Sequence, residues 1–135
     1  MSESLKFEFE FIVSEDLLDE YGHVNNAHYL ALYEKARWNI LEQSELGADT
    51  IKKNNIGPII LEVTIRFRKE LLEGQKIRIE TTSRRKNDKI FYFDQKMINE
   101  DGEIASKALF TAALFDLTKR KMIRADEKWL KAFGF

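Results

Sequence analysis

The chain has 135 residues with a formal net charge of -1, 44% hydrophobic residues and no cysteine. This length suits one globular domain over residues 1–135, which buries roughly two thirds of its unfolded surface. A charge near zero excludes a strong overall attraction to nucleic acid, and the lack of cysteine excludes disulfides and thiolate chemistry. The start has no basic leader, and no stretch approaches the roughly 20 apolar residues of a membrane span. We therefore expect a soluble, cytoplasmic protein that binds neither nucleic acid nor membrane.

The first predicted element is a strand over residues 5–11, where LKFEFEF alternates apolar and charged residues. This period of two is typical of a strand with one buried face. The residues expected to face inward are Leu5, Phe7, Phe9 and Phe11.

After a polar segment, apolar residues recur three and four positions apart, which predicts one long amphipathic helix. Its expected inward side comprises Tyr29, Leu30, Tyr33, Ala36, Arg37, Ile40 and Leu41. We expect Asn25 or Asn26 to cap its first turn and Gly47 to end it. Glu34, on the same helix, is expected to form an ordinary surface pair with Arg37 or another neighbour.

Alternation returns in ILEVTIRFR (60–68), beyond a loop expected at Gly57 and Pro58. Its inward residues would be Leu61, Val63, Ile65 and Phe67. The segments KIRIETTSR, IFYFDQKMIN and IASKALFTAALFDLT follow, separated by the turn-type sequences EGQ, RRKNDK and EDGE. The pattern therefore predicts about five strands, with DEKWLKAF as a short closing helix.

An antiparallel sheet with one apolar face needs a cover, and the long helix is the only candidate of sufficient length. We therefore expect an α+β fold in which this helix lies across the sheet. The opposite face would carry charges that are either solvated or in contact with a second copy: Lys6, Glu8, Glu10, Glu62, Arg66, Arg78 and Glu80. Open sheet edges favour pairing of two subunits into one continuous sheet.

Several kinds of chemistry are excluded by motif. The sequence contains no nucleophile elbow, phosphate-binding loop, dinucleotide-binding glycine turn or HExxH zinc motif. Its only two histidines, His23 and His28, lie five positions apart across the expected helix start, a separation that does not place both on one face. We therefore expect no metal and no cofactor.

The combination that remains is Asp19 beside the start of the long helix. Free N–H groups in a first helical turn carry partial positive charge and can hold an oxyanion. Asp19 could then attack a carbonyl placed there or deprotonate a water molecule aimed at it. The alternative is structural, with Asp19 and Gly22 as turn residues, the asparagines as caps and His23 half-buried.

The stretch DEYGHVNNAHYLALYEKAR, residues 19–37, resembles the hotdog-fold acyl-CoA thioesterases of the 4-hydroxybenzoyl-CoA thioesterase type. The specific part is D-x-x-G-H-V-N-N-x-x-Y followed by E-x-A-R, while the later strands match mainly in rhythm. The resemblance covers nearly the whole chain. It implies a hotdog fold, an antiparallel sheet wrapped around one long central helix, and hydrolysis of an acyl-CoA thioester to free acid and CoA.

The resemblance also assigns roles to residues. Asp19 matches the family's catalytic carboxylate, and Asn26 matches the residue whose backbone N–H is the oxyanion donor. In the related plant acyl-carrier-protein thioesterases, the histidine that matches His23 belongs to the proposed catalytic set, although Tyr21 here replaces their middle asparagine. Phe91, Phe93 and Phe110 are core candidates, any of which could line an acyl pocket.

The resemblance further places a CoA-binding group at Arg84, Arg85 and Lys86, because some family members bind the nucleotide through basic residues after a long strand. Cationic side chains suit the phosphates of CoA, whereas the alternative is a solvated hairpin turn. The partners implied are an acyl-CoA substrate and further copies of the chain, in a homodimer or a homotetramer (dimer of dimers). The alternative function is a non-catalytic hotdog module that binds acyl-CoA or lipid.

Overall fold

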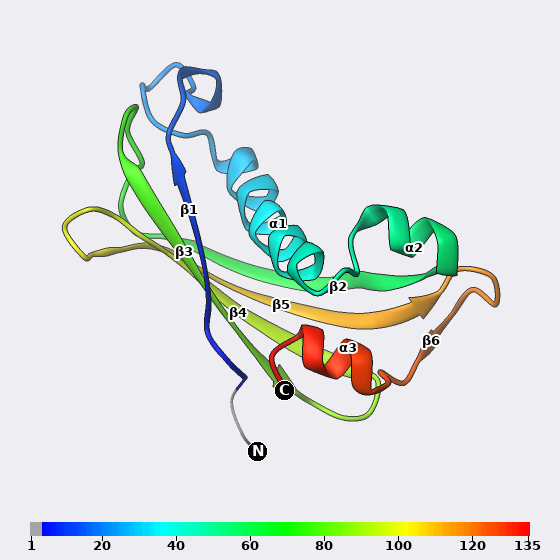
Figure 1. The fold of residues 1–135 in the computed structure, drawn as a ribbon. Coiled ribbons are helices and arrows are strands. Elements are labelled where there is room, and N and C mark those ends of the chain that lie inside the picture. Colours follow the sequence, from blue (N-terminus) through cyan, green and yellow to red (C-terminus); the bar gives the residue numbers. More distant parts are fainter. Residues whose placement is uncertain (1–3) are drawn as a thin grey trace.

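The computed structural model describes residues 4–135. One antiparallel sheet has the order β1-β3-β4-β5-β2, and a sixth strand, β6, pairs with β5. The strands are β1 (Phe7–Ile12), β2 (Ile56–Phe67), β3 (Lys76–Arg85), β4 (Ile90–Ile98), β5 (Ile104–Asp116) and β6 (Lys121–Ile123). Figure 1 shows the sheet curving around helix α1 (Asn26–Gln43), which confirms the predicted arrangement. The sequence predicted about five strands, and the structure adds the short strand β6, which has three residues.

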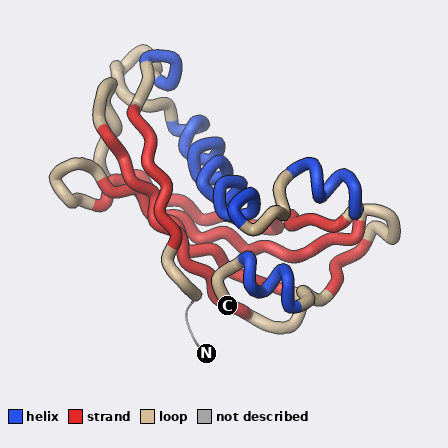
Figure 2. The backbone as a smooth tube through the Cα atoms, in the orientation of Figure 1, coloured by secondary structure: helices blue, strands red, loops and turns tan. Residues whose placement is uncertain are grey.

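Three shorter helical segments complete the fold, and Figure 2 shows them around the sheet. A single 3-10 turn (Glu15–Leu17) precedes α1, and α2 (Ala48–Asn54) lies between α1 and β2. The predicted closing helix is confirmed as α3 (Glu127–Ala132), where the Asp126 carboxylate accepts a hydrogen bond from the Trp129 N–H at 3.0 Å. The helix α2 was not predicted.

Two tyrosines of helix α1 contact the sheet directly. Tyr33 is fully buried, and its hydroxyl donates a 2.7 Å hydrogen bond to Ser106 Oγ on β5. Tyr29 is 3% exposed and meets the ring of Phe67 edge-on, with centroids 4.8 Å apart. Both were expected on the inward side, but Leu30 is 43% exposed, which corrects the prediction for that residue.

The expected stop of α1 at Gly47 is wrong, because the helix ends four residues earlier, at Gln43. Glu45 takes the left-handed conformation (φ 60°), its N–H donates to Glu42 O, and the Leu46 N–H donates to Leu41 O at 2.8 Å. This is a Schellman motif, which satisfies the last carbonyls and packs an apolar residue back on the helix. Leu46 is accordingly 2% exposed.

Gly57 and Pro58 lie inside β2 rather than in a loop. A Cβ at Gly57 would lie 2.9 Å from Ile51 Cγ2, so glycine is needed where α2 approaches the strand. Proline is tolerated at position 58 because β2 is at the edge of the sheet, where an N–H is not needed on the open side.

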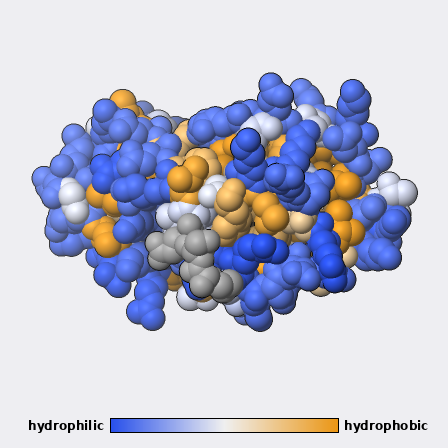
Figure 3. Space-filling view, turned by 60° about the horizontal axis from the view of Figure 1, so that its bottom comes forward, coloured by the Kyte–Doolittle hydropathy of each residue, from blue (hydrophilic) through white to orange (hydrophobic). Residues whose placement is uncertain are grey.

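The edge position of β2 also overturns part of the predicted core. Leu61, Val63 and Phe67 are 47%, 36% and 49% exposed, and the pairing register with β5 shifts between Ile60 and Glu62. Leu5 precedes β1 and is 70% exposed, so it does not belong to the core either. Figure 3 shows a face of the molecule on which apolar side chains reach the surface between hydrophilic regions.

The outer face of the sheet carries the predicted charges, and those on β1 and β3 are paired. Glu80 is only 8% exposed, and its carboxylate lies 3.5 Å from Lys6 Nζ, 3.2 Å from Arg78 and 3.7 Å from Lys96. Burial acts to raise the pKa of Glu80, but these cations outweigh it and hold the pKa below its ordinary value.

Candidate active site

Asp19 lies in a tight turn just before α1. Its N–H donates to His23 O and its own carbonyl accepts from the Gly22 N–H, both at 3.0 Å. Gly22 has φ +79°, which glycine adopts without strain. The Asp19 Oδ1 accepts the Tyr21 N–H at 2.9 Å, and the side chain is 18% exposed. The carboxylate is therefore held in one orientation yet remains in contact with solvent.

Asn25 links this carboxylate to the helix. Its Oδ1 accepts the Ala27 N–H at 2.9 Å, which makes Asn25 the predicted cap, and its Nδ2 lies 3.4 Å from Asp19 Oδ2. Asn26 is the first residue of α1, and within residues 4–135 its N–H has no protein acceptor. The structure thus brings together a carboxylate and a free N–H at the positive end of a helix.

His23 lies between two carboxylates. Its Nε2 is 3.7 Å from Asp19 Oδ2, and its Nδ1 is 3.2 Å from Glu70 Oε2. Glu70 follows β2 and was not anticipated, because no local pattern marks an acid that comes 47 positions after its partner. A ring placed between two acids can hold a proton on either nitrogen and orient the Asp19 carboxylate.

Arg37 fixes the middle of α1 from inside the fold. Its Nη1 donates to Gln95 Oε1 at 2.9 Å, and its guanidinium lies 4.1 Å from the Phe110 ring centroid. Burial lowers the pKa of Arg37 to about 10, while the charge of Glu34 acts in the opposite direction. Within residues 4–135 Arg37 has no carboxylate oxygen within 4 Å, so the expected contact with Glu34 is not a salt bridge.

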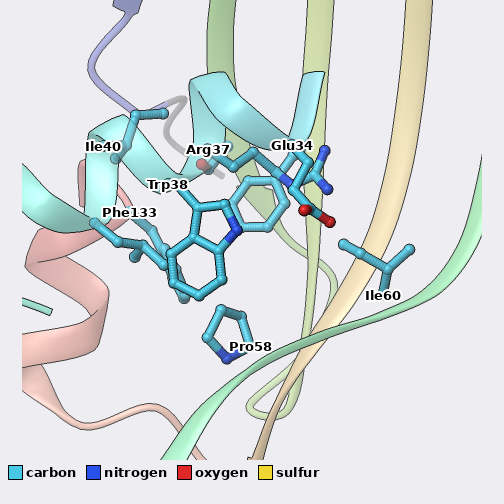
Figure 4. Close-up of a pocket in the computed structure, with 10 residues that line it drawn as sticks. Glu34, Arg37, Trp38, Ile40, Pro58, Ile60 and Phe133 are labelled. Atoms are coloured by element: carbon cyan, nitrogen blue, oxygen red, sulfur yellow. The ribbon is translucent and has the colours of Figure 1, made fainter. Parts of the chain in front are cut away.

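A cavity of about 80 Å³ lies beside the C-terminal half of α1, and Figure 4 shows its lining. We call it the α1–β2 cavity. Trp38 comes from α1, Pro58 and Ile60 from β2, and Phe133 from the end of α3. It is mostly apolar and distant from Asp19 along the helix.

The basic residues Arg84, Arg85 and Lys86 lie at the end of β3 and the start of the hairpin to β4. Arg84 is bonded to Asp94 at 2.7 Å, Arg85 lies 3.8 Å from Asp88, and Lys86 is exposed. The other end of β3 is next to the Asp19 turn, because His23 bridges to Leu72. Ten residues of strand span roughly 30 Å, so one chain does not bring this basic group to Asp19.

Residues 4–135 contain no group of three or more histidine, aspartate or glutamate side chains arranged to hold a metal ion. In the same part of the chain, no helix combines the length and apolar composition that crossing a membrane requires.

Comparison with known proteins identifies the family to which the chain belongs. The model of the thioesterase-like superfamily matches residues 13–133. The long-chain acyl-CoA thioesterase FadM of Escherichia coli K12 is 31% identical over 110 residues, which cover 81% of this chain and 83% of FadM.

Two solved structures share the fold at lower identity. A 1,4-dihydroxy-2-naphthoyl-CoA thioesterase from Synechocystis has a TM-score of 0.86 at 18% identity, with 95% of each chain covered. The Staphylococcus aureus protein SAV2348, solved in complex with CoA, has a TM-score of 0.87 at 16% identity, covering 96% of this chain and 82% of the other.

The sheet wrapped around α1 is a hotdog fold, and together with the 31% identity to FadM it identifies the chain as a thioester hydrolase. The chain belongs to the thioesterase-like superfamily.

Proposed function

We propose that the protein hydrolyses acyl-CoA thioesters to a free carboxylic acid and CoA, with Asp19 and the Asn26 N–H as the reacting site. The observation that carries the proposal is the position of the Asp19 carboxylate, 3.4 Å from the side chain of Asn25, which caps α1 and directly precedes Asn26, whose N–H has no acceptor among residues 4–135. The similarity to FadM supports a fatty acyl-CoA as the substrate.

In this mechanism the thioester carbonyl oxygen accepts a hydrogen bond from the Asn26 N–H. Negative charge develops on this oxygen in the transition state, where a fixed donor at a helix N-terminus stabilises it most. Asp19 either attacks the carbonyl carbon, forming an anhydride that water then cleaves, or removes a proton from the attacking water. The C–S bond breaks and CoA leaves as the thiolate.

His23 would act on Asp19 rather than on the substrate carbonyl. Its Nε2 lies 3.7 Å from the Asp19 carboxylate while Glu70 holds the other nitrogen. This arrangement keeps the ring in place and makes His23 a positioning residue, which can also take up the proton that Asp19 releases.

The CoA nucleotide would bind to Arg84, Arg85 and Lys86 of a second copy. In one chain these residues and Asp19 lie at opposite ends of β3. A dimer or tetramer can bring the hairpin of one copy to the turn of another. Its formation is favoured by the open edge of β2, where the apolar side chains of Leu61 and Val63 are exposed.

The test is Asp19→Asn, which keeps the shape of the side chain and the acceptor for the Tyr21 N–H. Loss of a base or nucleophile should lower kcat/KM at least about a hundredfold, measured as thiol release from a panel of acyl-CoAs. Asp16→Asn, an exposed acid in the preceding 3-10 turn, is the matched control and should keep full activity.

Circular dichroism and CoA affinity should be unchanged in Asp19→Asn. Turnover at the wild-type rate in this variant would refute the role of Asp19. Tight acyl-CoA binding by the wild-type protein without any thiol release would instead favour a non-catalytic binding module.

A further inference from the structure

The two ends of α1 carry different features. At the N-terminal end, the Asn26 N–H has no acceptor within the part of the chain that the structure describes, and the C-terminal half forms one wall of the α1–β2 cavity. The cavity volume, about 80 Å³, is several times that required by one water molecule. Trp38 of α1 and Pro58 of β2 face each other across it in Figure 4. An apolar space of this kind suits hydrocarbon better than water.

The inner end of the cavity is closed by aromatic rings. Phe93 of β4 and Phe133 meet edge-on with centroids 5.3 Å apart. Phe133 is 3% exposed and also packs against Phe91 at 5.1 Å and Trp129 at 5.8 Å. The last residues of the chain therefore form a rigid floor.

The outer end of the cavity opens onto exposed apolar surface. Ile60, at the rim, is 41% exposed. Farther along β2, Val63 is exposed, and Phe67 reaches Tyr29 in the first turn of α1. Apolar side chains of β2 thus lie between the start of α1 and the cavity, where Glu34 of α1 joins Ile60 in the lining (Figure 4).

The length of this route sets the class of ligand. Eight positions separate Asn26 from Glu34, the residue of α1 nearest the helix start that lines the cavity, so the distance is about 12 Å at 1.5 Å per helical residue. An extended chain advances roughly 1.2 Å per bond. A hydrocarbon chain that begins at the Asn26 N–H therefore needs roughly ten bonds to reach the cavity, and a short acyl group does not reach it.

We propose that the α1–β2 cavity binds the distal end of a long-chain acyl group and that Phe133 sets the longest chain that fits. The proposal rests on the function proposed above, because it takes the thioester to lie at Asn26. It assigns substrate selection to the C-terminal helix, which contributes nothing to the reacting groups.

The first test changes the two ends of the cavity. Ile60→Phe narrows the rim, and Met122→Phe, at an exposed apolar residue of β6 outside the cavity lining, is the control. The ratio of kcat/KM for long-chain over short-chain acyl-CoA should fall about tenfold in Ile60→Phe, as expected for two methylene groups that are no longer buried. Met122→Phe should leave the ratio unchanged.

Phe133→Leu should shift the preferred chain length upward, because the floor recedes. Phe135→Leu is its control, since Phe135 packs on the same Phe91 ring but does not line the cavity. If Phe133→Leu fails to fold, Ile60→Phe still tests the proposal, because position 60 is exposed and tolerates substitution more readily. An unchanged chain-length profile in Ile60→Phe would overturn the proposal.

A binding measurement separates this proposal from the catalytic one. In the Asp19→Asn protein, the fluorescence of Trp38 should change on addition of long-chain acyl-CoA but not of short-chain acyl-CoA or CoA, and Trp38→Phe should abolish the change. Equal responses to all three ligands would overturn the cavity assignment. Full turnover in Asp19→Asn would refute the role of Asp19 alone, because the fluorescence response does not require hydrolysis.

Discussion

Asn25 connects the stability of α1 to the orientation of Asp19, and two substitutions separate these roles. Its Oδ1 accepts the Ala27 N–H at 2.9 Å, and its Nδ2 donates to Asp19 Oδ2 at 3.4 Å. Asn25→Ala removes both contacts. Asn25→Ser keeps a capping oxygen, because serine is as good a cap as asparagine, but its shorter side chain has no donor that reaches Asp19.

The magnitudes follow from the two contacts. Loss of a cap costs about 1 kcal/mol, and loss of a long hydrogen bond to a carboxylate costs up to about 1 kcal/mol more. Asn25→Ala should therefore lower the free energy of unfolding by about 1–2 kcal/mol, with a fall in Tm of roughly 4 °C per kcal/mol. Asn25→Ser keeps the cap and loses only the hydrogen bond to Asp19, so its free energy of unfolding should fall by no more than about 1 kcal/mol.

Activity should respond differently from stability. Both variants release one side of the Asp19 carboxylate, so kcat/KM for acyl-CoA hydrolysis should fall about tenfold in each, the equivalent of about 1.4 kcal/mol. Urea unfolding and thiol release on the same preparations measure the two effects. Wild-type activity in Asn25→Ser would show that the contact with Asp19 is irrelevant. Equal loss of stability in both variants would refute the capping role.

Two further predictions concern the sheet. Glu80→Gln should lower the free energy of unfolding by about 1–2 kcal/mol at pH 7; because the pKa of Glu80 is depressed, this stabilisation is present above the ordinary value of 4.5 and is lost as pH falls through the folded-state pKa. Urea unfolding at pH 7 and pH 3 measures the difference in free energy of unfolding between the wild type and Glu80→Gln, with Glu8→Gln, at an exposed position, as the control. A difference that is the same at both pH values would contradict the prediction. Val63→Lys, on the open edge, should reduce the oligomer to smaller species by light scattering, whereas Thr118→Lys in an exposed turn should not.

Alternation predicted the strands well because antiparallel neighbours in register share a face. Phe93 opposes Phe110 in the β4–β5 pair, and both are buried. The same alternation failed to predict exposure on β2, since Val63 and Phe67 have the correct period but lie at an edge that α1 does not fully cover. Period reports which side a residue faces, and only the strand order reports whether that side is covered.

Local conformation was least predictable where tertiary packing overrides residue preference. Glu45 occupies the left-handed position that glycine usually takes, because Leu46 is then placed in the core. The sequence pattern predicts a turn at Gly57, whereas in the structure this glycine leaves room for the Ile51 side chain beside the strand. Neither fact is visible from the neighbouring residues alone.

The part of the site that the sequence predicted is local, and the part that it missed is long-range. Asp19, Asn25 and Asn26 lie within eight positions, so a turn followed by a helix cap suffices to bring them together. Glu70 and Gln95 reach His23 and Arg37 only through the folded sheet. The distance between Asp19 and the basic hairpin likewise required knowledge of where each end of β3 lies.

The asymmetry of a helix explains why the reacting groups and the apolar cavity lie at opposite ends of α1. At its start the N–H of Asn26 is free among the described residues, which favours a carboxylate or an oxyanion nearby. At its end the Schellman motif satisfies the carbonyls of Leu41 and Glu42. A cavity beside Leu41 can therefore be lined mostly by apolar side chains without exposing unpaired backbone groups, so that its polar lining is limited to the side chains of Glu34, Arg37 and Ser83.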